Sequence, residues 1–515
     1  MSESRVTNVK RNAASSIFQN ILNIFLAYIS RVIFVQILDV RYLGINGLFS
    51  NIIAVLSLAD LGMGTAMMYS LYKPIANHDN EKIAAYINFF KRIYISIACV
   101  ISLIGIALIP FLRYIVKLEQ PLEHLEIYYC LSLAEVVISY LFVYRTTLLS
   151  ADQKNYILNK YSNIAKITIF CLRLIILFAF KNYFLYLLVA IIVNLGNNIL
   201  MNHITVKMYP FLKTAKSDLE RNEKTALWQN VKALFFYKLG SVLQGNVDNI
   251  LISVFVGTIY VGYYSNYSMI ITYIVSFVSI VFSSVKATLG NLMTSEENNE
   301  AKKLHIFNVM ELINFWIITF CSVCFISLFQ SFIELSYGKS YLIELPVVVL
   351  VVINFYTCNI RQTMWAFRET TGIFQQTKYI TMVTTSINFI LSLILGYFYG
   401  MFGIILATII ARLVYAWWKE PQILFKTQFK KSARIYYTRY IIRLCLCFFI
   451  CFINYKLCVL LPINNLVFKF IVQVVICCIF PNLVLLLLYG RTEEFSYIVN
   501  TLFKSKLALV KKGKN

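Results

Sequence analysis

Residues 158–180, LNKYSNIAKITIFCLRLIILFAF, and residues 183–206, YFLYLLVAIIVNLGNNILMNHITV, are two apolar stretches separated only by Lys181 and Asn182. The hydrocarbon core of a bilayer is about 30 Å thick, and a helix needs about 20 apolar residues to cross it. Both stretches are long enough to cross, and the joint between them is too short for a soluble segment. The pair therefore predicts two neighbouring transmembrane helices.

The same pattern runs from residue 14 to residue 490, with a polar joint roughly every 20 to 30 residues. The chain is 59% hydrophobic and 14% charged, and its mean hydropathy is +0.70. Soluble domains are about 45–50% apolar and about 25% charged. We therefore predict an all-α polytopic membrane protein with about 14 transmembrane helices. The expected spans are residues 14–39, 44–70, 91–112, 126–149, 158–180, 183–206, 233–256, 260–286, 305–331, 344–368, 378–398, 401–420, 436–459 and 465–489.

The net charge of +23 is distributed unevenly over the polar joints. If the N-terminus lies inside, the outer joints together hold about as many basic residues as the single inner joint at 207–232. More lysines and arginines follow at 426–439 and 504–514. Basic residues collect on the cytoplasmic side of membrane proteins. We therefore expect a protein of the cytoplasmic membrane with both termini inside, whose charge contacts lipid head groups and not nucleic acid.

Motifs of enzymes and metal proteins are missing from the sequence. Most of the 12 cysteines fall in apolar spans, and Cys321 and Cys324 form a C-x-x-C without a second pair or a nearby histidine. The four histidines do not cluster, and no zinc, phosphate-loop or hydrolase signature is present. We expect no enzyme activity, no metal site and no cofactor.

An internal repeat divides the chain. SRVIFVQIL (30–38), YLG (42–44) and SN (50–51) resemble VDNILISVF (247–255), YVG (260–262) and SN (265–266). A shift of about 217 residues superimposes them with small gaps, which predicts two parallel six-helix lobes. The expected parts are an N-terminal lobe with a cytoplasmic linker (1–225), a C-terminal lobe (226–426), and two further helices with a basic tail (427–515). Chance similarity between apolar segments is the alternative.

Polar stripes mark four of the expected helices, at 14–39, 44–70, 233–256 and 260–286. Polar residues inside a membrane face the bundle or a wet cavity, so we expect these helices to line a space between the lobes. A charge at a helix centre costs about 2.5–3.5 kcal/mol, so pairing or hydration must offset the intramembrane charges. Basic residues outnumber acidic ones, which predicts a positive cavity. The candidate cavity residues are Arg31, Asp60, Glu135, Lys166, Arg173, Gln244, Asp248, Arg361 and Arg368.

Other roles are open for several of these residues. Lys166, Arg361 and Arg368 could instead reach the inner membrane interface with their charged ends, and Asp60 could pair with a neighbouring helix. Arg31 and Asp248 occupy equivalent positions in the repeat and could pair across the lobes. The carboxylates Asp60, Glu135, Asp248 and Glu311 are candidate sites for a coupling proton or sodium ion.

Several segments resemble the O-antigen and capsule flippases (Wzx-type), polysaccharide exporters of the multidrug/oligosaccharidyl-lipid/polysaccharide superfamily. They are YLGINGLFSNIIAVLSLADLGMGTAMMYSLYKPIANHDNEKI (42–83), GSVLQGNVDNILISVFVG (240–257), VGYYSNYSMI (261–270), NFYTCNIRQTMWAFRETTGIFQQTKY (354–379) and WWKEPQILFK (417–426). The resemblance implies 14 helices, with two six-helix lobes around a central cavity. It also implies alternating-access transport of an undecaprenyl-pyrophosphate-linked oligosaccharide, the repeat unit of O-antigen, capsule or exopolysaccharide.

The resemblance has further implications. The Ser30-Arg31 pair is similar to a serine-arginine pair of lipid II flippases, whose arginine serves the substrate site. The helices at 436–459 and 465–489 occupy the place where those relatives hold the lipid tail. The implied partners are the lipid-linked oligosaccharide, membrane lipids, a polysaccharide polymerase with its chain-length machinery, and a coupling proton or sodium ion.

Two rival functions stay open. A multidrug or cation antiporter of the same superfamily should have an acidic, aromatic cavity, whereas basic residues predominate here. A membrane glycosyltransferase or polysaccharide polymerase should carry acidic residues on sizeable outer loops. The outer joints here are short, and only the one near residues 113–125 holds several acids.

Overall fold

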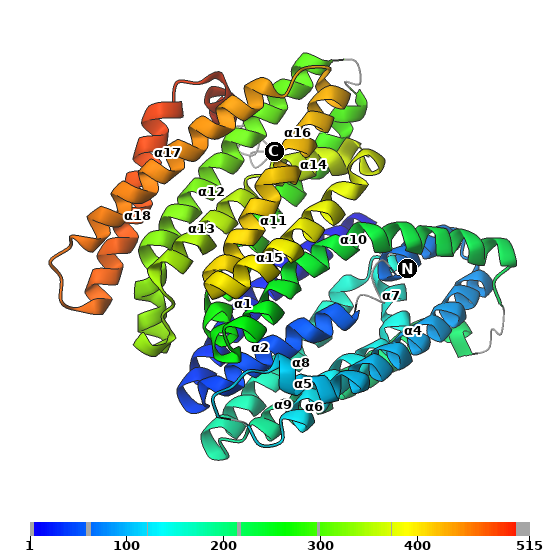
Figure 1. Ribbon diagram of the computed structural model, residues 1–515. Helices are drawn as coiled ribbons and strands as arrows, with labels where there is room; N and C mark the ends of the chain where they lie inside the picture. The colour runs from blue at the N-terminus through cyan, green and yellow to red at the C-terminus, as the bar shows by residue number, and fades with distance from the viewer. Residues whose placement is uncertain are drawn as a thin grey trace, which may run out of the picture. The chain divides into compact units, whose positions relative to one another are not determined.

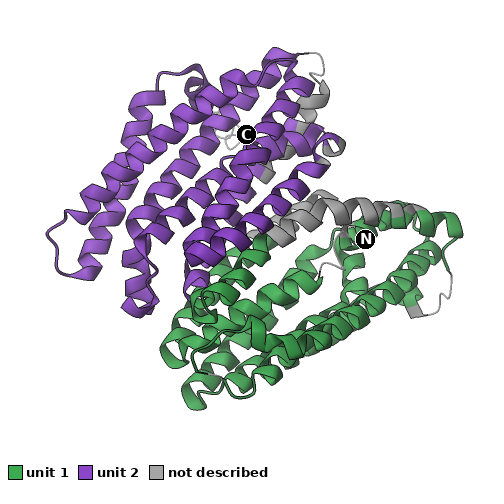
Figure 2. Cartoon of the chain, viewed as in Figure 1, with its two compact units in different colours: residues 1–262 green, residues 263–515 purple. Residues whose placement is uncertain are grey.

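The computed structural model describes residues 5–57, 63–120, 122–213, 218–295, 299–371 and 373–500. Within these ranges the chain is almost entirely helical and has no strand (Figure 1). The prediction of an all-α membrane protein is confirmed. The chain forms two compact units, residues 1–262 and residues 263–515 (Figure 2).

Nine helices of the described ranges are long and apolar enough to cross a membrane, and ten if the bent pair Leu125–Tyr140 and Val143–Ala151 forms one span. One of the nine, Tyr379–Phe429, covers two expected spans, 378–398 and 401–420. A kink at Gly400 separates these two spans. The expected spans at 44–70, 233–256 and 260–286 are not among the nine. These are three of the four segments whose sequences carry polar stripes.

The N-terminal unit consists of the first ten helices and the start of the eleventh. Within it α1 packs on α8, α9 packs on both α8 and α6, and α10 packs on α2 and α3. This packing places α10 in the N-terminal unit, whereas the repeat predicts a lobe boundary at residue 225. The lobe limits at 225 and 426 remain a prediction. The bounds are α1 Arg5–Ile37, α2 Val40–Leu56, α3 Met63–Ala76, α4 Asn80–Leu108, α5 Leu112–Ile115, α6 Leu125–Tyr140, α7 Val143–Ala151, α8 Asn155–Ala179, α9 Tyr183–Met208, α10 Arg221–Phe255 and α11 Thr258–Ser295.

The C-terminal unit is built around α12, which packs against α13, α14, α17 and α18 (Figure 1). Aromatic rings fill its core at one end. The ring centre of Phe307 lies 5.2 Å from that of Phe367 and 5.4 Å from those of Phe425 and Phe429. These rings join α12 to α14 and to the segment after α16. The bounds are α12 Glu300–Tyr337, α13 Leu345–Asn359, α14 Gln362–Thr371, α15 Phe374–Ala411, α16 Trp417–Leu424, α17 Arg434–Val459 and α18 Leu466–Tyr489.

Two glycines that correspond in the repeat lie in contact. Gly44 is in α2 and Gly262 is in α11, and a Cβ atom added to Gly262 would lie 3.0 Å from the Gly44 nitrogen. A Cβ atom added to Gly44 would lie 2.9 Å from the Thr258 carbonyl carbon and would overlap its oxygen.

We expect Gly44→Ala to lower the free energy of unfolding by about 1–3 kcal/mol, because the added methyl group overlaps backbone that cannot move aside. The matched control is Gly196→Ala in α9, where a Cβ atom meets nothing within 4 Å. That change should stabilise the helix by about 0.5–1 kcal/mol. Thermal unfolding of the detergent-solubilised variants measures both effects. Equal shifts for the two variants would show that the α2–α11 contact is loose.

Candidate functional site

The span expected at 344–368 is broken into two helices in the structure. α13 ends at Asn359 and α14 begins at Gln362, so Arg361 lies at the break. The side-chain amide of Asn314, on α12, donates to the carbonyl oxygens of Asn359 and Ile360 over 3.2 and 2.7 Å. Backbone groups freed at a break inside a membrane must be satisfied by the protein. In transporters, such broken helices often form the substrate site.

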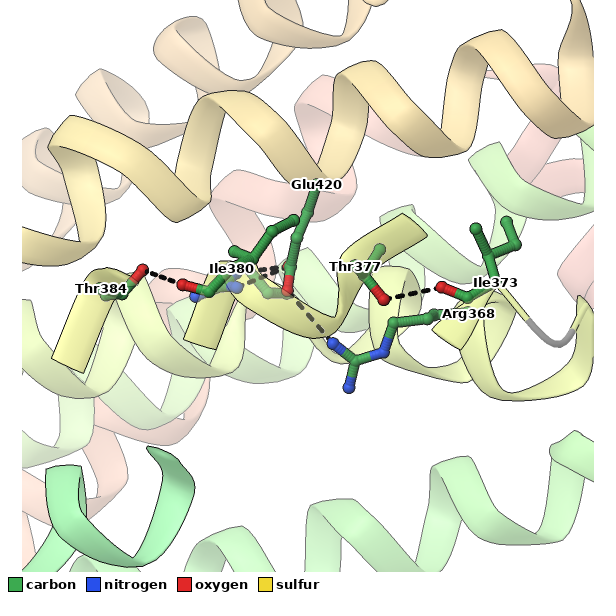
Figure 3. Close-up of polar contacts among 7 residues, drawn as sticks. Arg368, Ile373, Thr377, Ile380, Thr384 and Glu420 are labelled. Atoms are coloured by element: carbon green, nitrogen blue, oxygen red, sulfur yellow. Dashed lines mark hydrogen bonds and ion pairs between the residues drawn. The ribbon is translucent and has the colours of Figure 1, made fainter. Parts of the chain in front are cut away.

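Arg361 and Arg368 share one carboxylate, that of Glu420 on α16. An Arg361 Nη atom lies 2.5 Å from Glu420 Oε2, and an Arg368 Nη atom lies 3.3 Å from Oε1. The three side chains are only 10%, 13% and 6% exposed. Neither arginine reaches out to an interface, as the alternative from the sequence supposed. Figure 3 shows Arg368 directed at Glu420, while Thr377 donates to the carbonyl of Ile373, the residue before α15, and Thr384 to that of Ile380 in α15.

A third buried arginine, Arg412, lies close to α13. It begins the π-helical turn Arg412–Ala416 and is 4% exposed. One Nη atom donates to the Asn354 side-chain oxygen over 2.9 Å and to the Thr357 hydroxyl over 2.8 Å. Both acceptors lie on α13, within two turns of the break at Arg361. Three guanidinium groups are therefore buried around the α13–α14 region, and two of them are bridged by a single carboxylate.

Little free space remains beside this cluster. The cavity lined by Arg368, Glu420 and Thr377 has a volume of about 10 Å³, which is room for roughly one water molecule. An anion larger than water would therefore have to displace Glu420 from one of the arginines or enter after the helices have moved.

In the N-terminal unit, three of the predicted charged residues bond to neutral groups on neighbouring helices. Lys166 donates to the Asn23 side-chain oxygen over 2.9 Å, joining α8 to α1. Asn194, on α9, donates to Glu135, on α6, over 2.9 Å. Arg173 donates to the Tyr186 carbonyl over 3.2 Å, and its guanidinium carbon lies 4.1 Å from the centre of that ring. None of the three forms an ion pair within the described part of the chain.

Arg31 lies on α1 and Asp248 on α10, both partly exposed, and their pairing stays a prediction. Asp60 lies outside the described residues, and so does the side chain of Gln244 on α10. Glu311, a candidate coupling carboxylate, is buried, with its Oε2 atom 2.9 Å from an Arg443 Nη atom.

Sequence reasoning missed Glu420, Arg412, Arg443 and Asn314. Glu420 is the last residue of the span expected at 401–420, and Arg412 lies inside that span. Both carried the signal that identified the other charges, namely a charged residue within an apolar stretch. Asn314 carried no such signal, because asparagines occur in many of the spans.

The fold resembles solved transporters and flippases. The lipid II flippase MurJ, in an inward closed conformation, superimposes with a TM-score of 0.66 at 15% identity, over 93% of this chain and 98% of that one. An inward-facing multidrug resistance MATE family transporter of the MOP superfamily gives a TM-score of 0.56 at 16% identity, over 79% and 96%. A variant of the Vibrio cholerae MATE transporter VcmN gives 0.55 at 16% identity, over 83% and 99%.

No protein-family profile matches the sequence, and no curated protein matches it. At these identities the structural likeness shows the fold alone. The chain is therefore a multi-pass membrane protein with the fold that MurJ and the MATE transporters share.

Proposed function

We propose that the chain is a flippase that moves an undecaprenyl-pyrophosphate-linked oligosaccharide across the cytoplasmic membrane by alternating access. The observation that carries the proposal is the cluster of Arg361, Arg368 and Glu420, in which two buried guanidinium groups share one carboxylate. The net charge of these three side chains is +1. Arginine binds phosphate through two parallel hydrogen bonds, so a pyrophosphate can replace Glu420 as the acceptor for one or both arginines.

An apolar groove in the same unit supports a lipid-linked substrate. It lies between α12, α13 and α17 and has a volume of about 190 Å³. Its walls are almost entirely apolar, with Ile326, Val349, Leu444, Phe448 and Phe452 among the lining residues. Such a groove can hold part of a polyprenyl chain in the same unit as the arginine cluster. The arginine cluster would then shelter the charged head group. Placement in the cytoplasmic membrane, with both termini inside, belongs to the same proposal.

A multidrug or cation antiporter is the second candidate. One observation favours it: Glu135 is partly buried, and Asn194 is its only hydrogen-bonding partner among the described residues. A carboxylate without a cationic partner can carry a proton or bind a cationic drug. Glu311 does not fit this role, because Arg443 pairs with it.

The test is a strain from which the gene is deleted. Lipid-linked oligosaccharide should accumulate on the inner leaflet, and the wild-type gene should return it to the outer leaflet, as measured by glycan labelling of spheroplasts. We expect Arg368→Gln to slow this transfer about 10- to 100-fold, because one hydrogen bond to a charged group is lost. Glu420 then keeps Arg361 as a partner, so the variant should fold.

The matched control is Arg113→Gln, which removes an arginine whose side chain is 83% exposed. Its transfer rate should stay at the wild-type level when expression is equal. The antiporter would be favoured if the deletion strain kept normal glycan distribution but became sensitive to cationic dyes. In that case Glu135→Gln, and not Arg368→Gln, should reproduce the sensitivity.

A further inference from the structure

A cavity of about 200 Å³ lies in the C-terminal unit, apart from the arginine cluster. It is formed where the start of α17, the end of α18 and the side of α12 meet. The charge distribution of the sequence predicts that this end of the helices lies at the inner membrane face. The residues that line it include Leu312, Arg439, Arg443, Tyr489, Thr492 and Glu494.

The cavity presents a cation and an anion side by side. An Arg439 Nη atom lies 4.0 Å from a Glu494 oxygen, and the two side chains are 43% and 24% exposed. A pair that is this exposed and this long contributes little, so both groups can bond to a ligand. Arg443 is only 10% exposed, and its charge is offset by Glu311 at 2.9 Å. The charges around the cavity therefore sum to zero.

Packing, and not the ion pair, holds Glu494 in position. Phe495 stacks on Trp316 of α12 with ring centres 5.7 Å apart. Tyr497 meets His305 of the same helix at 5.2 Å. The backbone N–H of Phe495 donates to the Thr492 hydroxyl over 3.3 Å. Because the residues directly after Glu494 contact α12 at two points, the carboxylate stays beside Arg439 even when the arginine turns to another partner.

Apolar side chains flank the cavity on the outer surface of both helices. Ile435 and Ile442 on α17 are 67% and 59% exposed, and Leu487 and Leu488 on α18 are 74% and 54% exposed. In a membrane these side chains face lipid tails. A ligand that fills this cavity therefore has a charged head beside long apolar chains, which describes a phospholipid.

We propose that this cavity binds the head group of phosphatidylethanolamine. Its phosphate accepts hydrogen bonds from Arg439 and Arg443, and its ammonium donates to Glu494. A cavity of zero net charge suits a zwitterion better than an anion. Phosphatidylglycerol brings no cation for Glu494, and the methylated ammonium of phosphatidylcholine has no N–H to donate. The proposal does not depend on what the protein transports.

The test is lipid titration of the delipidated full chain, followed by native mass spectrometry. Phosphatidylethanolamine, phosphatidylglycerol and phosphatidylcholine with identical acyl chains are the probes. We expect the wild type to bind phosphatidylethanolamine about tenfold more tightly than the other two. Arg439→Gln should weaken binding of all three lipids. Glu494→Gln should abolish the preference over phosphatidylglycerol while leaving phosphate binding intact.

The matched control is Arg434→Gln, an exposed arginine in the first turn of the same helix and outside the cavity. It should bind all three lipids as the wild type does. Equal losses in Arg434→Gln and Arg439→Gln would show diffuse attraction to lipid and would overturn the proposal. A wild type that prefers phosphatidylglycerol, or that does not distinguish the lipids, would overturn it as well.

Discussion

Glu420→Gln is expected to lower the free energy of unfolding by about 3–5 kcal/mol, which is the usual cost of removing one partner of a buried ion pair. The carboxylate is 6% exposed and holds Arg361 and Arg368 at 2.5 and 3.3 Å. Glutamine keeps the shape of the side chain but not its charge, so two guanidinium groups lose the anion that they share. Thermal unfolding of the detergent-solubilised protein measures the loss.

Two further variants define the cause of that loss. Glu344→Gln is the matched control, because Glu344 is exposed and its side chain makes no capping bond at the start of α13. It should unfold at the wild-type temperature. Glu420→Asp keeps the charge but is one methylene shorter, so it should hold one arginine and give an intermediate result. If Glu420→Gln were as stable as Glu344→Gln, the cluster would not be anchoring α14 to α16.

Hydropathy predicts most of the expected spans, because each span must bury its own length of apolar sequence in lipid. It does not predict the break at Arg361. The two residues that precede Arg361, Asn359 and Ile360, are no more polar than residues within unbroken spans. The break is stabilised by Asn314, a residue 45 positions away from Asn359 along the chain. A local pattern cannot carry such a long-range contact.

The candidate site was predictable to the extent that burying a charge is costly. Arg361 and Arg368 were identified because two charges lie seven residues apart in an apolar stretch. Their shared partner could not be identified, because Glu420 is 59 residues from Arg361 and 52 from Arg368. Lys166 and its acceptor Asn23 are 143 residues apart. Sequence shows which charges need partners, and tertiary packing decides which partners they find.

Arg443→Met is expected to lower the free energy of unfolding by about 3–5 kcal/mol, and adding Glu311→Leu should recover most of the loss. The single change leaves Glu311, whose side chain is 5% exposed, without its arginine. The double change replaces the ion pair by apolar groups of similar size, which is often neutral or stabilising. Thermal unfolding of both variants and of Glu311→Leu alone gives the coupling between the two residues.

The same double variant tests whether Glu311 carries a coupling ion. If the pair only joins α12 to α17, the double variant should be stable and should transport at the wild-type rate. If Glu311 loads and releases a proton or a sodium ion, the double variant should fold but fail to transport. The first result is expected, because a carboxylate 2.9 Å from a buried guanidinium group has a permanent positive partner and gains little from a second one.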